Sequence, residues 1–215
     1  SVYLRPVDGQ PVENFLAGQH LPIRLNIPGQ SKPIVRCYSL SNAAGEGVYR
    51  ISVKAVPAPP NQPNTPAGLV SNYINQHVSV GDVIEAKSPS GSFVMERNSD
   101  RTVVMLAGGV GITPMVSMIR EAIAQNDQRM MVLVYGCVNR QEQAFRDWLD
   151  EQVAGRDNLV LINCFSSPLP TEVMGQDYQI SGYVSAELLQ KLLPDTQNDF
   201  YLCGPPPFMA SLTKG

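Results

Sequence analysis

The sequence predicts a two-domain protein, in which an antiparallel Greek-key β-barrel is followed by an α/β domain with a doubly wound parallel sheet. The first part of the chain alternates short strand-like runs with turn pairs such as Asp8-Gly9, Pro28-Gly29 and Ser90-Gly91. That spacing is typical of small antiparallel barrels. From about residue 101, apolar strands alternate with helical segments, which indicates a parallel sheet covered by helices. The boundary is predicted at residues 98–100, giving domains at residues 1–99 and 100–215.

Composition narrows the class of protein. The chain has 215 residues, of which 43% are hydrophobic and 16% charged, so a sizeable core is expected. The net charge of −3 and the lack of a Lys/Arg run argue against a nucleic-acid partner. The longest apolar stretch, residues 102–116, is interrupted by glycines and a proline, so no membrane span is expected. Four scattered cysteines without a CxxC pair, and only two histidines, favour a reducing cytoplasm and no metal site.

In the first domain, strands are expected at residues 1–4, 21–27 and 48–56. The proline-rich segment at 56–66 is expected to be an exposed loop, because proline cannot pair in a central strand. Residues 68–75 read as a glycine turn that enters a short helix. The first turn of such a helix offers free N–H groups to a phosphate.

In the second domain, strands are expected at residues 102–107, 130–138, 158–165 and 200–203. Helices are expected between them at 113–125, 141–152 and 185–193. Thr113 is expected to cap the first helix, with Pro114 as its first residue. A further helix should start at the prolines of residues 205–207.

The segment Arg36-Cys37-Tyr38-Ser39 combines a cation, an aromatic ring and a hydroxyl within four residues. In an extended segment Arg36 and Tyr38 would share one face, and Cys37 and Ser39 the other. This set suits a flat ligand with a phosphate tail, which needs an aromatic wall, an arginine and a hydrogen-bonding hydroxyl. The alternative is an ordinary strand with a surface arginine.

A second pattern, Gly109-x-Gly111-x-x-Pro114, lies between a strand and a helix and predicts a pyrophosphate cradle. The alternative is a tight turn that binds nothing. In dinucleotide-binding sheets an acidic residue at the end of the second strand usually hydrogen-bonds the ribose of the nucleotide. In this chain Asn139 and Arg140 occupy that position. Arg140 could hold a 2′-phosphate or be a solvated arginine, so NADH and NADPH both remain open.

A third signal is Cys203-Gly204-Pro205, at the end of the last predicted strand. Ligands bind at the carboxyl ends of the strands in such sheets. Cys203 could therefore face a nicotinamide, or it could be a merely buried thiol. It is not interpreted as a nucleophile, because no base can be placed beside it.

Taken in order, Arg36-x-Tyr38-Ser39, Gly68-x-Val70-Ser71, Gly109-x-Gly111-x-x-Pro114 and Cys203-Gly204-Pro205 resemble the ferredoxin–NADP reductase superfamily. The likeness is closer to the reductase part of flavohaemoglobins and bacterial oxygenase reductases, through residues 17–19, 49–54, 68–73 and 200–205. The chain departs from that pattern at His20, where flavohaemoglobins usually have Tyr. It also ends at Gly215, whereas the family continues into one more strand, so we expect a fragment of a longer polypeptide whose sheet lacks its last strand.

The resemblance implies roles for individual residues. Tyr38 would pack on the isoalloxazine ring of FAD, Ser39 would hydrogen-bond near N5, and Cys203 with Gly204 would close over the nicotinamide. Tyr38, Ser39 and Cys203 are thus the expected catalytic residues. The remaining expected cofactor contacts are Arg36 on the FAD phosphate, Cys37 beside it, Val53 and Lys54 along the flavin, Gly68, Leu69, Val70 and Ser71 on its pyrophosphate, and Gly109, Val110, Gly111, Ile112, Thr113, Pro114 and Pro205 on NAD(P)H.

The implied reaction is hydride transfer from C4 of NAD(P)H to N5 of FAD, followed by release of single electrons to a haem or [2Fe-2S] domain or protein. The two rings would stack at roughly 3–3.5 Å, so the protein would act by positioning rather than by acid–base chemistry. Two alternatives remain: a non-catalytic flavin- or nucleotide-binding regulatory module, and an FMN-dependent oxygenase reductase. Residues 68–71 favour FAD, because FMN has no pyrophosphate for that loop to hold.

Overall fold

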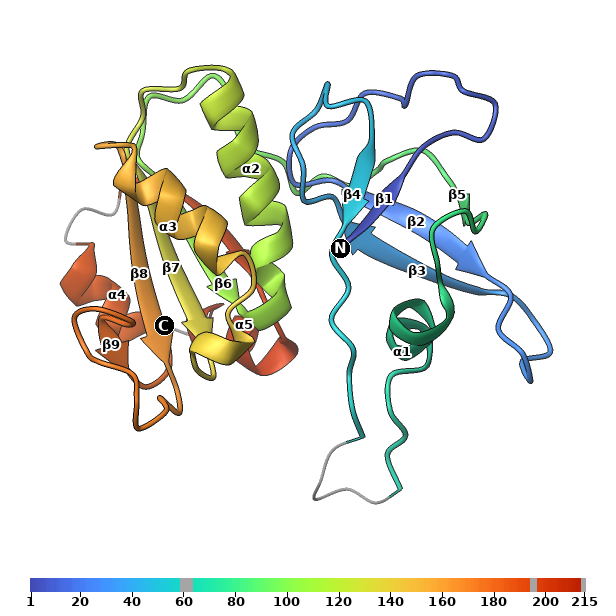
Figure 1. The fold of residues 1–215 in the computed structure, drawn as a ribbon. Coiled ribbons are helices and arrows are strands. Elements are labelled where there is room, and N and C mark those ends of the chain that lie inside the picture. Colours follow the sequence, from blue (N-terminus) through green and yellow to red (C-terminus); the bar gives the residue numbers. More distant parts are fainter. Residues whose placement is uncertain (59–63, 194–196, 214–215) are drawn as a thin grey trace. The chain divides into compact units, whose positions relative to one another are not determined.

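A computed structural model describes residues 1–58, 64–193 and 197–213 (Figure 1). The chain forms two compact units, each with its own packing. Unit 1 comprises Ser1–Met95 and Val116–Ala124, and unit 2 comprises Glu96–Met115 and Gln125–Gly215. Residues 59–63 of the predicted proline-rich loop lie outside the described residues.

Unit 1 is built from antiparallel strands, as predicted, with one whole helix and residues Val116–Ala124 of helix α2 (Ile112–Ala124) (Figure 1). One sheet has the order β3 (Ile34–Ser39), β2 (His20–Leu25), β5 (Glu85–Ala86). A second sheet pairs β1 (Val2–Leu4) with β4 (Tyr49–Ile51), and a bridge from Leu40 to Ile51 links the end of β3 to β4. The helix is α1 (Leu69–His77).

Alternation along β2 builds the core of unit 1. Leu21, Ile23 and Leu25 are buried, whereas Arg24 between them is exposed. These side chains pack with the buried face of α1, formed by Val70 and Ile74. Full burial of each aliphatic side chain contributes about 1.5–3 kcal/mol, so this face fixes the position of the helix on the sheet.

Polar groups hold residues Val116–Ala124 of helix α2 (Ile112–Ala124) in unit 1. Ser117 Oγ donates to the Asn42 carbonyl oxygen at 2.7 Å, and Glu121 Oε2 accepts from the Ala44 N–H at 3.3 Å. Ser117, Glu121 and Asn42 are all buried. Buried polar groups are costly unless they are paired, so these contacts define one register for the helix.

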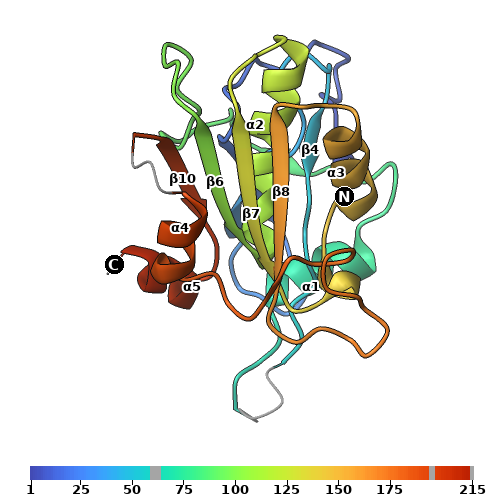
Figure 2. The same cartoon turned by 90° about the vertical axis from the view of Figure 1, so that its left-hand side faces the viewer.

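Unit 2 is a parallel sheet with helices, again as predicted. Among the described residues, five strands form it, in the order β10 (Asp199–Cys203), β6 (Val103–Gly108), β7 (Met131–Cys137), β8 (Leu159–Phe165) and β9 (Ile180–Ser181). Figure 2 shows β10, β6, β7 and β8 side by side, and Figure 1 labels β9. The helical segments of unit 2 are η1 (Gly109–Gly111), the first four residues of α2 (112–115), η2 (Arg140–Glu142), α3 (Arg146–Ala154), α4 (Ala186–Leu192) and α5 (Pro206–Thr213).

Both faces of this sheet are covered. Val104, Leu106 and Val134 pack with Leu188 and Leu189 of α4 and with Phe208 of α5. The alternate positions Val103, Met105 and Leu133 are fully buried as well and point to the opposite face. The continuous apolar runs seen in the sequence are what a doubly covered parallel strand requires.

Several predicted elements differ in detail from the structure. The expected helix at 141–152 is wrong in its first half. The short helix η2 ends at Glu142, and Phe145, with a left-handed φ of 60°, interrupts the helical conformation before α3 begins. The expected strand at 48–56 stops at Ile51, because the carbonyls of Val53 and Val56 accept hydrogen bonds from α1 instead. The two-residue strand β9 was not predicted.

Helix α2 begins at Ile112, so the expectation that Thr113 caps it is wrong. Thr113 lies in the first turn, and its hydroxyl donates to the Val110 carbonyl at 3.1 Å. The Ser185 cap of α4 is confirmed, since Ser185 Oγ accepts from the Leu188 N–H at 3.2 Å. No helix among the described residues is long and apolar enough to cross a bilayer.

Candidate nucleotide-binding sites

The segment Arg36-Cys37-Tyr38-Ser39 lies on β3, at the edge of its three-stranded sheet. Its register against β2 pairs Ser39 with His20, Tyr38 with Leu21 and Arg36 with Ile23. Arg36 and Cys37 are exposed, whereas Tyr38 and Ser39 are half-buried. An edge strand leaves one side of its backbone open, which is where a ligand can approach.

Arg36 and Tyr38 act on each other electrostatically, as residues two apart on a strand should. Burial raises the pKa of the Tyr38 phenol, and the nearby Arg36 charge opposes that rise. Tyr38 packs against the core of unit 1 on one side. Arg36 Nη1 donates to the Val35 carbonyl at 2.8 Å, which places the guanidinium close to the strand backbone. The segment thus places the half-buried phenol ring of Tyr38 next to the exposed guanidinium of Arg36.

The N-terminus of α1 is tied to residues 53–56. Asn72 Nδ2 donates to the carbonyls of Val56 and Gly68, both at 2.8 Å, and Asn75 Nδ2 donates to the Val53 carbonyl at 3.2 Å. The Asn72 N–H is the donor to the Gly68 carbonyl at 3.1 Å. The N–H groups of residues 69–71 therefore precede the helical hydrogen-bond ladder and point out of the helix end.

Gly68 is needed for packing within the chain. A β-carbon added there would lie 2.6 Å from Ser71 Oγ and 3.0 Å from Val56 Cβ. Next to this glycine, an open pocket of about 490 Å³ runs along α1; its lining includes Gly68, Leu69, Tyr73 and His77. The helix end thus lies beside a concave surface within unit 1.

In unit 2 the glycine loop and the end of β10 come together. A β-carbon added at Gly111 would lie 2.2 Å from the Cys203 carbonyl oxygen and 2.7 Å from the Gly204 nitrogen. Two motifs separated by some ninety residues of sequence are therefore in direct backbone contact, at the carboxyl ends of neighbouring strands β6 and β10. Gly109, at φ +53°, differs, because a β-carbon there would meet no atom within 4 Å. The loop is closed on the side of Gly111 and open at Gly109.

Phe208 of α5 completes this corner. Its ring fills the space that side chains on Gly108 and Gly204 would need, at 2.8 Å and 2.5 Å from the added β-carbons. Cys203 is partly buried, and burial raises the pKa of its thiol. A thiol held neutral in this way is a poor nucleophile. The surroundings of Cys203 thus give no sign of an activated thiol, and whether it faces a nicotinamide stays a prediction.

Asn139 and Arg140 lie just after β7, which ends at Cys137, at the start of η2. Asn139 Oδ1 accepts from the Gln141 N–H at 3.1 Å and caps η2. The Arg140 guanidinium forms an ion pair with Asp177, and the Arg140 N–H donates to Glu172 Oε1 at 2.8 Å. Both carboxylates come from the segment after β8, and nothing in the local sequence of Arg140 signals them.

The chain was compared with known proteins. A sequence model described as "Oxidoreductase NAD-binding domain" matches residues 105–214, and one described as "Oxidoreductase FAD-binding domain" matches residues 10–95. The chain belongs to this oxidoreductase family. It is 37% identical over 209 residues to a protein named flavohemoprotein from Bacillus anthracis, covering 97% of this chain and 51% of the relative. The chain thus spans about half the length of the curated relatives it matches.

Solved structures agree. The FAD/NAD-binding domain of nitric oxide dioxygenase from Vibrio cholerae superposes with a TM-score of 0.83 and 31% identity, over 99% of this chain and 83% of that chain. A flavohemoglobin from Malassezia yamatoensis has a TM-score of 0.77 over 97% of this chain and 49% of that chain; at 20% identity it supports the fold alone. The resemblance to ferredoxin reductases and flavohaemoglobin reductases is confirmed.

The family is that of NAD(P)H-dependent flavin oxidoreductases with FAD and NAD(P)H as cofactors. Neither the non-catalytic module nor the FMN enzyme is supported by these matches. The residues present fit the two nucleotides. The α1 N-terminus and the exposed Arg36 carry N–H groups of the kind that bind phosphate, and the glycine loop is open at Gly109, where an added β-carbon would meet no atom within 4 Å.

Proposed function

We propose that this chain oxidises NAD(P)H, reduces FAD and passes the electrons one at a time to a haem or [2Fe-2S] domain or protein, with haem as the favoured acceptor. The haem preference is supported by relatives named flavohemoprotein, half of whose length this chain spans. Residues 1–99 would bind FAD and residues 100–215 NAD(P)H. When bound, FAD supplies the two-electron to one-electron conversion.

The observation that carries the proposal is the contact between Gly111 and Cys203. It joins the glycine loop and the Cys203-Gly204-Pro205 turn into one surface at the carboxyl ends of the strands, the place where parallel sheets bind nucleotides. Gly109, Val110, Gly111, Ile112, Thr113 and Pro114 would support the dinucleotide, and Cys203 with Gly204 would limit how the nicotinamide can turn. Positioning of this kind is the main contribution a protein makes to hydride transfer.

On unit 1, Arg36 would neutralise an FAD phosphate and Tyr38 would lie against the isoalloxazine. Ser39 would donate a hydrogen bond near N5, and Cys37, Val53 and Lys54 would lie along the flavin. The three N–H groups at the start of α1 would bind the pyrophosphate. The pocket beside Gly68 leaves space for the adenosine end. The four separate thiols support a cytoplasmic setting as part of the same proposal.

A direct test is to load the protein with FAD and supply NADH together with a one-electron haem acceptor such as cytochrome c. The proposal predicts that NADH oxidation and haem reduction run in a ratio of one NADH to two haems. Replacing cytochrome c with a plant-type [2Fe-2S] ferredoxin shows which acceptor is preferred. NADH oxidation with neither acceptor reduced would contradict the electron-transfer role.

A further inference from the structure

Arg140 lies at the carboxyl end of the second strand of the β6–α2–β7 unit. In dinucleotide-binding sheets this position meets the adenosine ribose. An acidic residue there binds the 2′-hydroxyl of NAD, whereas a nearby arginine accommodates the 2′-phosphate of NADP. By this rule, an Arg140 side chain free to reach the nucleotide would favour NADPH.

The surroundings of Arg140 oppose that interpretation. Its guanidinium is paired with Asp177, whose side chain is only 12% exposed. Glu172 accepts the Arg140 N–H at 2.8 Å through one carboxylate oxygen and the Leu169 N–H at 2.8 Å through the other. Asp177 therefore pairs with the Arg140 guanidinium, Glu172 binds the Arg140 backbone, and these three side chains together carry one net negative charge.

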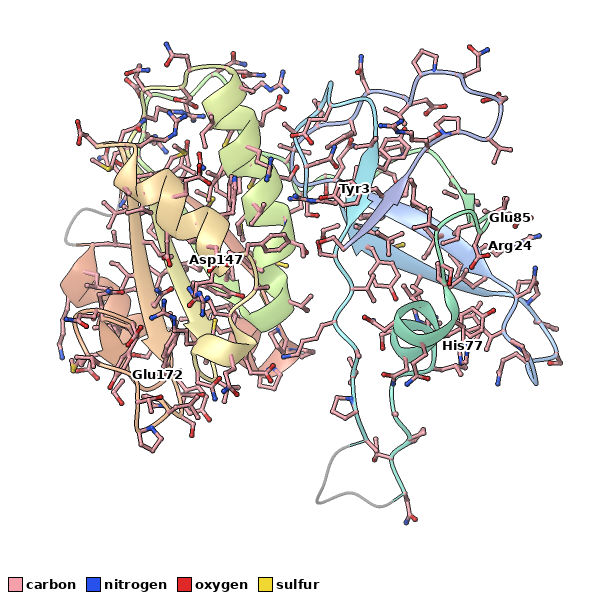
Figure 3. All side chains as sticks on the ribbon, viewed as in Figure 1. Tyr3, Arg24, His77, Glu85, Asp147 and Glu172 are labelled. Atoms are coloured by element: carbon pink, nitrogen blue, oxygen red, sulfur yellow. The ribbon has the colours of Figure 1, made fainter. Side chains whose placement is uncertain are left out.

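Both carboxylates are fixed in place. Asp177 Oδ2 also accepts the Val173 N–H at 2.8 Å, and Glu172 bridges two backbone donors. Glu172, labelled in Figure 3, lies at the end of unit 2 where strands β7 and β8 end; their arrowheads are seen in Figure 1. A side chain held by backbone hydrogen bonds cannot swing away at little cost to make room for a competing anion.

We propose that Asp177, supported by Glu172, is a specificity-determining residue that keeps Arg140 from a 2′-phosphate and makes this chain prefer NADH to NADPH. A 2′-phosphate would have to compete with Asp177 for the Arg140 guanidinium. It would also have to lie beside the carboxylates of Asp177 and Glu172, which backbone hydrogen bonds hold in place. Like charges placed side by side are strongly unfavourable. A 2′-hydroxyl avoids both penalties and can donate to a carboxylate oxygen. The inference rests on the proposed nucleotide site of unit 2.

The test compares wild type with Asp177→Asn, which keeps the shape and the Val173 hydrogen-bond acceptor but removes the charge. Calorimetry on the FAD-loaded protein would measure the Kd of 5′-AMP and of 2′,5′-ADP, which differ only in the 2′-phosphate. We expect wild type to bind 5′-AMP more tightly. We expect Asp177→Asn to tighten 2′,5′-ADP on the order of tenfold and to leave the Kd of 5′-AMP within about twofold of the wild-type value. The ratio of kcat/KM for NADPH to that for NADH should rise by a similar factor.

Asp147→Asn is the matched control. Asp147 is an exposed carboxylate on α3 that pairs with Arg146 at 2.8 Å, and Figure 3 labels it. This variant should leave the preference between the two nucleotides unchanged. Glu172→Gln provides a second test at the same site, with a smaller shift in the same direction, and keeps the inference testable if Asp177→Asn does not fold. Adding Arg140→Ala to Asp177→Asn should abolish the gain.

Two results would overturn the inference alone: a wild type that binds 2′,5′-ADP more tightly than 5′-AMP, or an unchanged preference in Asp177→Asn and Glu172→Gln. Failure of both nucleotides to bind, with no flavin reduction by NADH or NADPH, would instead overturn the proposed function and this inference with it. The two failures are therefore distinguishable.

Discussion

Gly111 and Cys203 are in backbone contact, so close that a β-carbon on Gly111 would lie 2.2 Å from the Cys203 carbonyl oxygen. The atom it would strike belongs to the backbone and cannot rotate out of the way. This single contact fixes how the glycine loop after β6 meets the end of β10. The candidate nicotinamide site therefore depends on two segments that are far apart in sequence.

Gly111→Ala should disrupt this corner. The added methyl forces the two segments apart, and overpacking of this kind costs about 1–3 kcal/mol. We expect a corresponding fall in the free energy of unfolding measured in urea, together with weaker NADH binding. Gly155→Ala is the control: Gly155 lies at the end of α3, where an added β-carbon meets its nearest atom at an ordinary 3.5 Å. Equal stability of the two variants would show that the corner tolerates the methyl.

Ser39→Ala should slow reduction of the flavin without releasing FAD. The change removes one hydroxyl from β3 and leaves Arg36, Tyr38 and the α1 N-terminus in place. Loss of one well-placed donor at a reacting centre commonly lowers the rate about a hundredfold or more. A donor beside N5 stabilises less developing charge, so we expect the rate of flavin reduction to fall roughly tenfold. Anaerobic stopped-flow measurement of flavin bleaching checks this, with the exposed Ser88→Ala as control. An unchanged bleaching rate in Ser39→Ala would remove Ser39 from the proposed site.

Alkylation should distinguish the cysteines. Cys37 is exposed, whereas burial raises the pKa of the Cys203 thiol and raises that of Cys164 to about 11. Because the thiolate is the reactive form, Cys37 should react first with iodoacetamide near pH 8, and Cys203 and Cys164 much more slowly. Peptide mass spectrometry over time measures this order, and Cys37→Ser should lack the fast phase. Reaction of Cys203 as fast as Cys37 would mean that Cys203 is an activated thiol after all.

Stability should fall at alkaline pH, and Tyr135 should be one cause. Tyr135 is fully buried, and burial raises its pKa above the usual value of 10.0. The folded state thus retains a proton that the unfolded state loses. The resulting stabilisation is complete below pH 10 and declines above it, by at most about 1.4 kcal/mol per pH unit for one group.

Tyr135→Phe should therefore lose stability less steeply above pH 10. At neutral pH it should be about 1 kcal/mol less stable, because the Ala144 N–H loses its acceptor, the Tyr135 oxygen at 3.2 Å. Urea unfolding at a series of pH values tests both effects. The exposed Tyr183→Phe serves as control. Parallel pH profiles for wild type and Tyr135→Phe would exclude Tyr135 as a contributor.

The sequence predicted the strands of unit 2 well because β6 is buried along its whole length, β7 has no exposed residue, and β8 is apolar apart from Asn163. It failed where tertiary contacts override local pattern. Phe145 adopts φ 60° and splits an amphipathic run that reads as one helix. β9 has only two residues, too few for any periodicity to show.

The same limit applies to the candidate sites. Short local motifs were enough to predict some of the candidate residues: Arg36, Tyr38, Gly109, Gly111 and Cys203. The contacts of three other residues could not be predicted in this way. Phe208 packs on Gly108 and Gly204. Glu172 and Asp177 contact Arg140, which lies about thirty residues or more away from them in sequence. Only the pairing of β6 with β10, and the return of the chain after β8, bring such groups together.

The central claim is that this chain transfers a hydride from a nicotinamide to FAD. Mixing the FAD-loaded protein anaerobically with one equivalent of NADH tests it most directly, by following loss of the yellow flavin absorbance in a single turnover. The account predicts complete bleaching, slowed when the transferred hydrogen at C4 of NADH is replaced by deuterium. A protein that binds FAD yet keeps it oxidised with both NADH and NADPH would contradict the account.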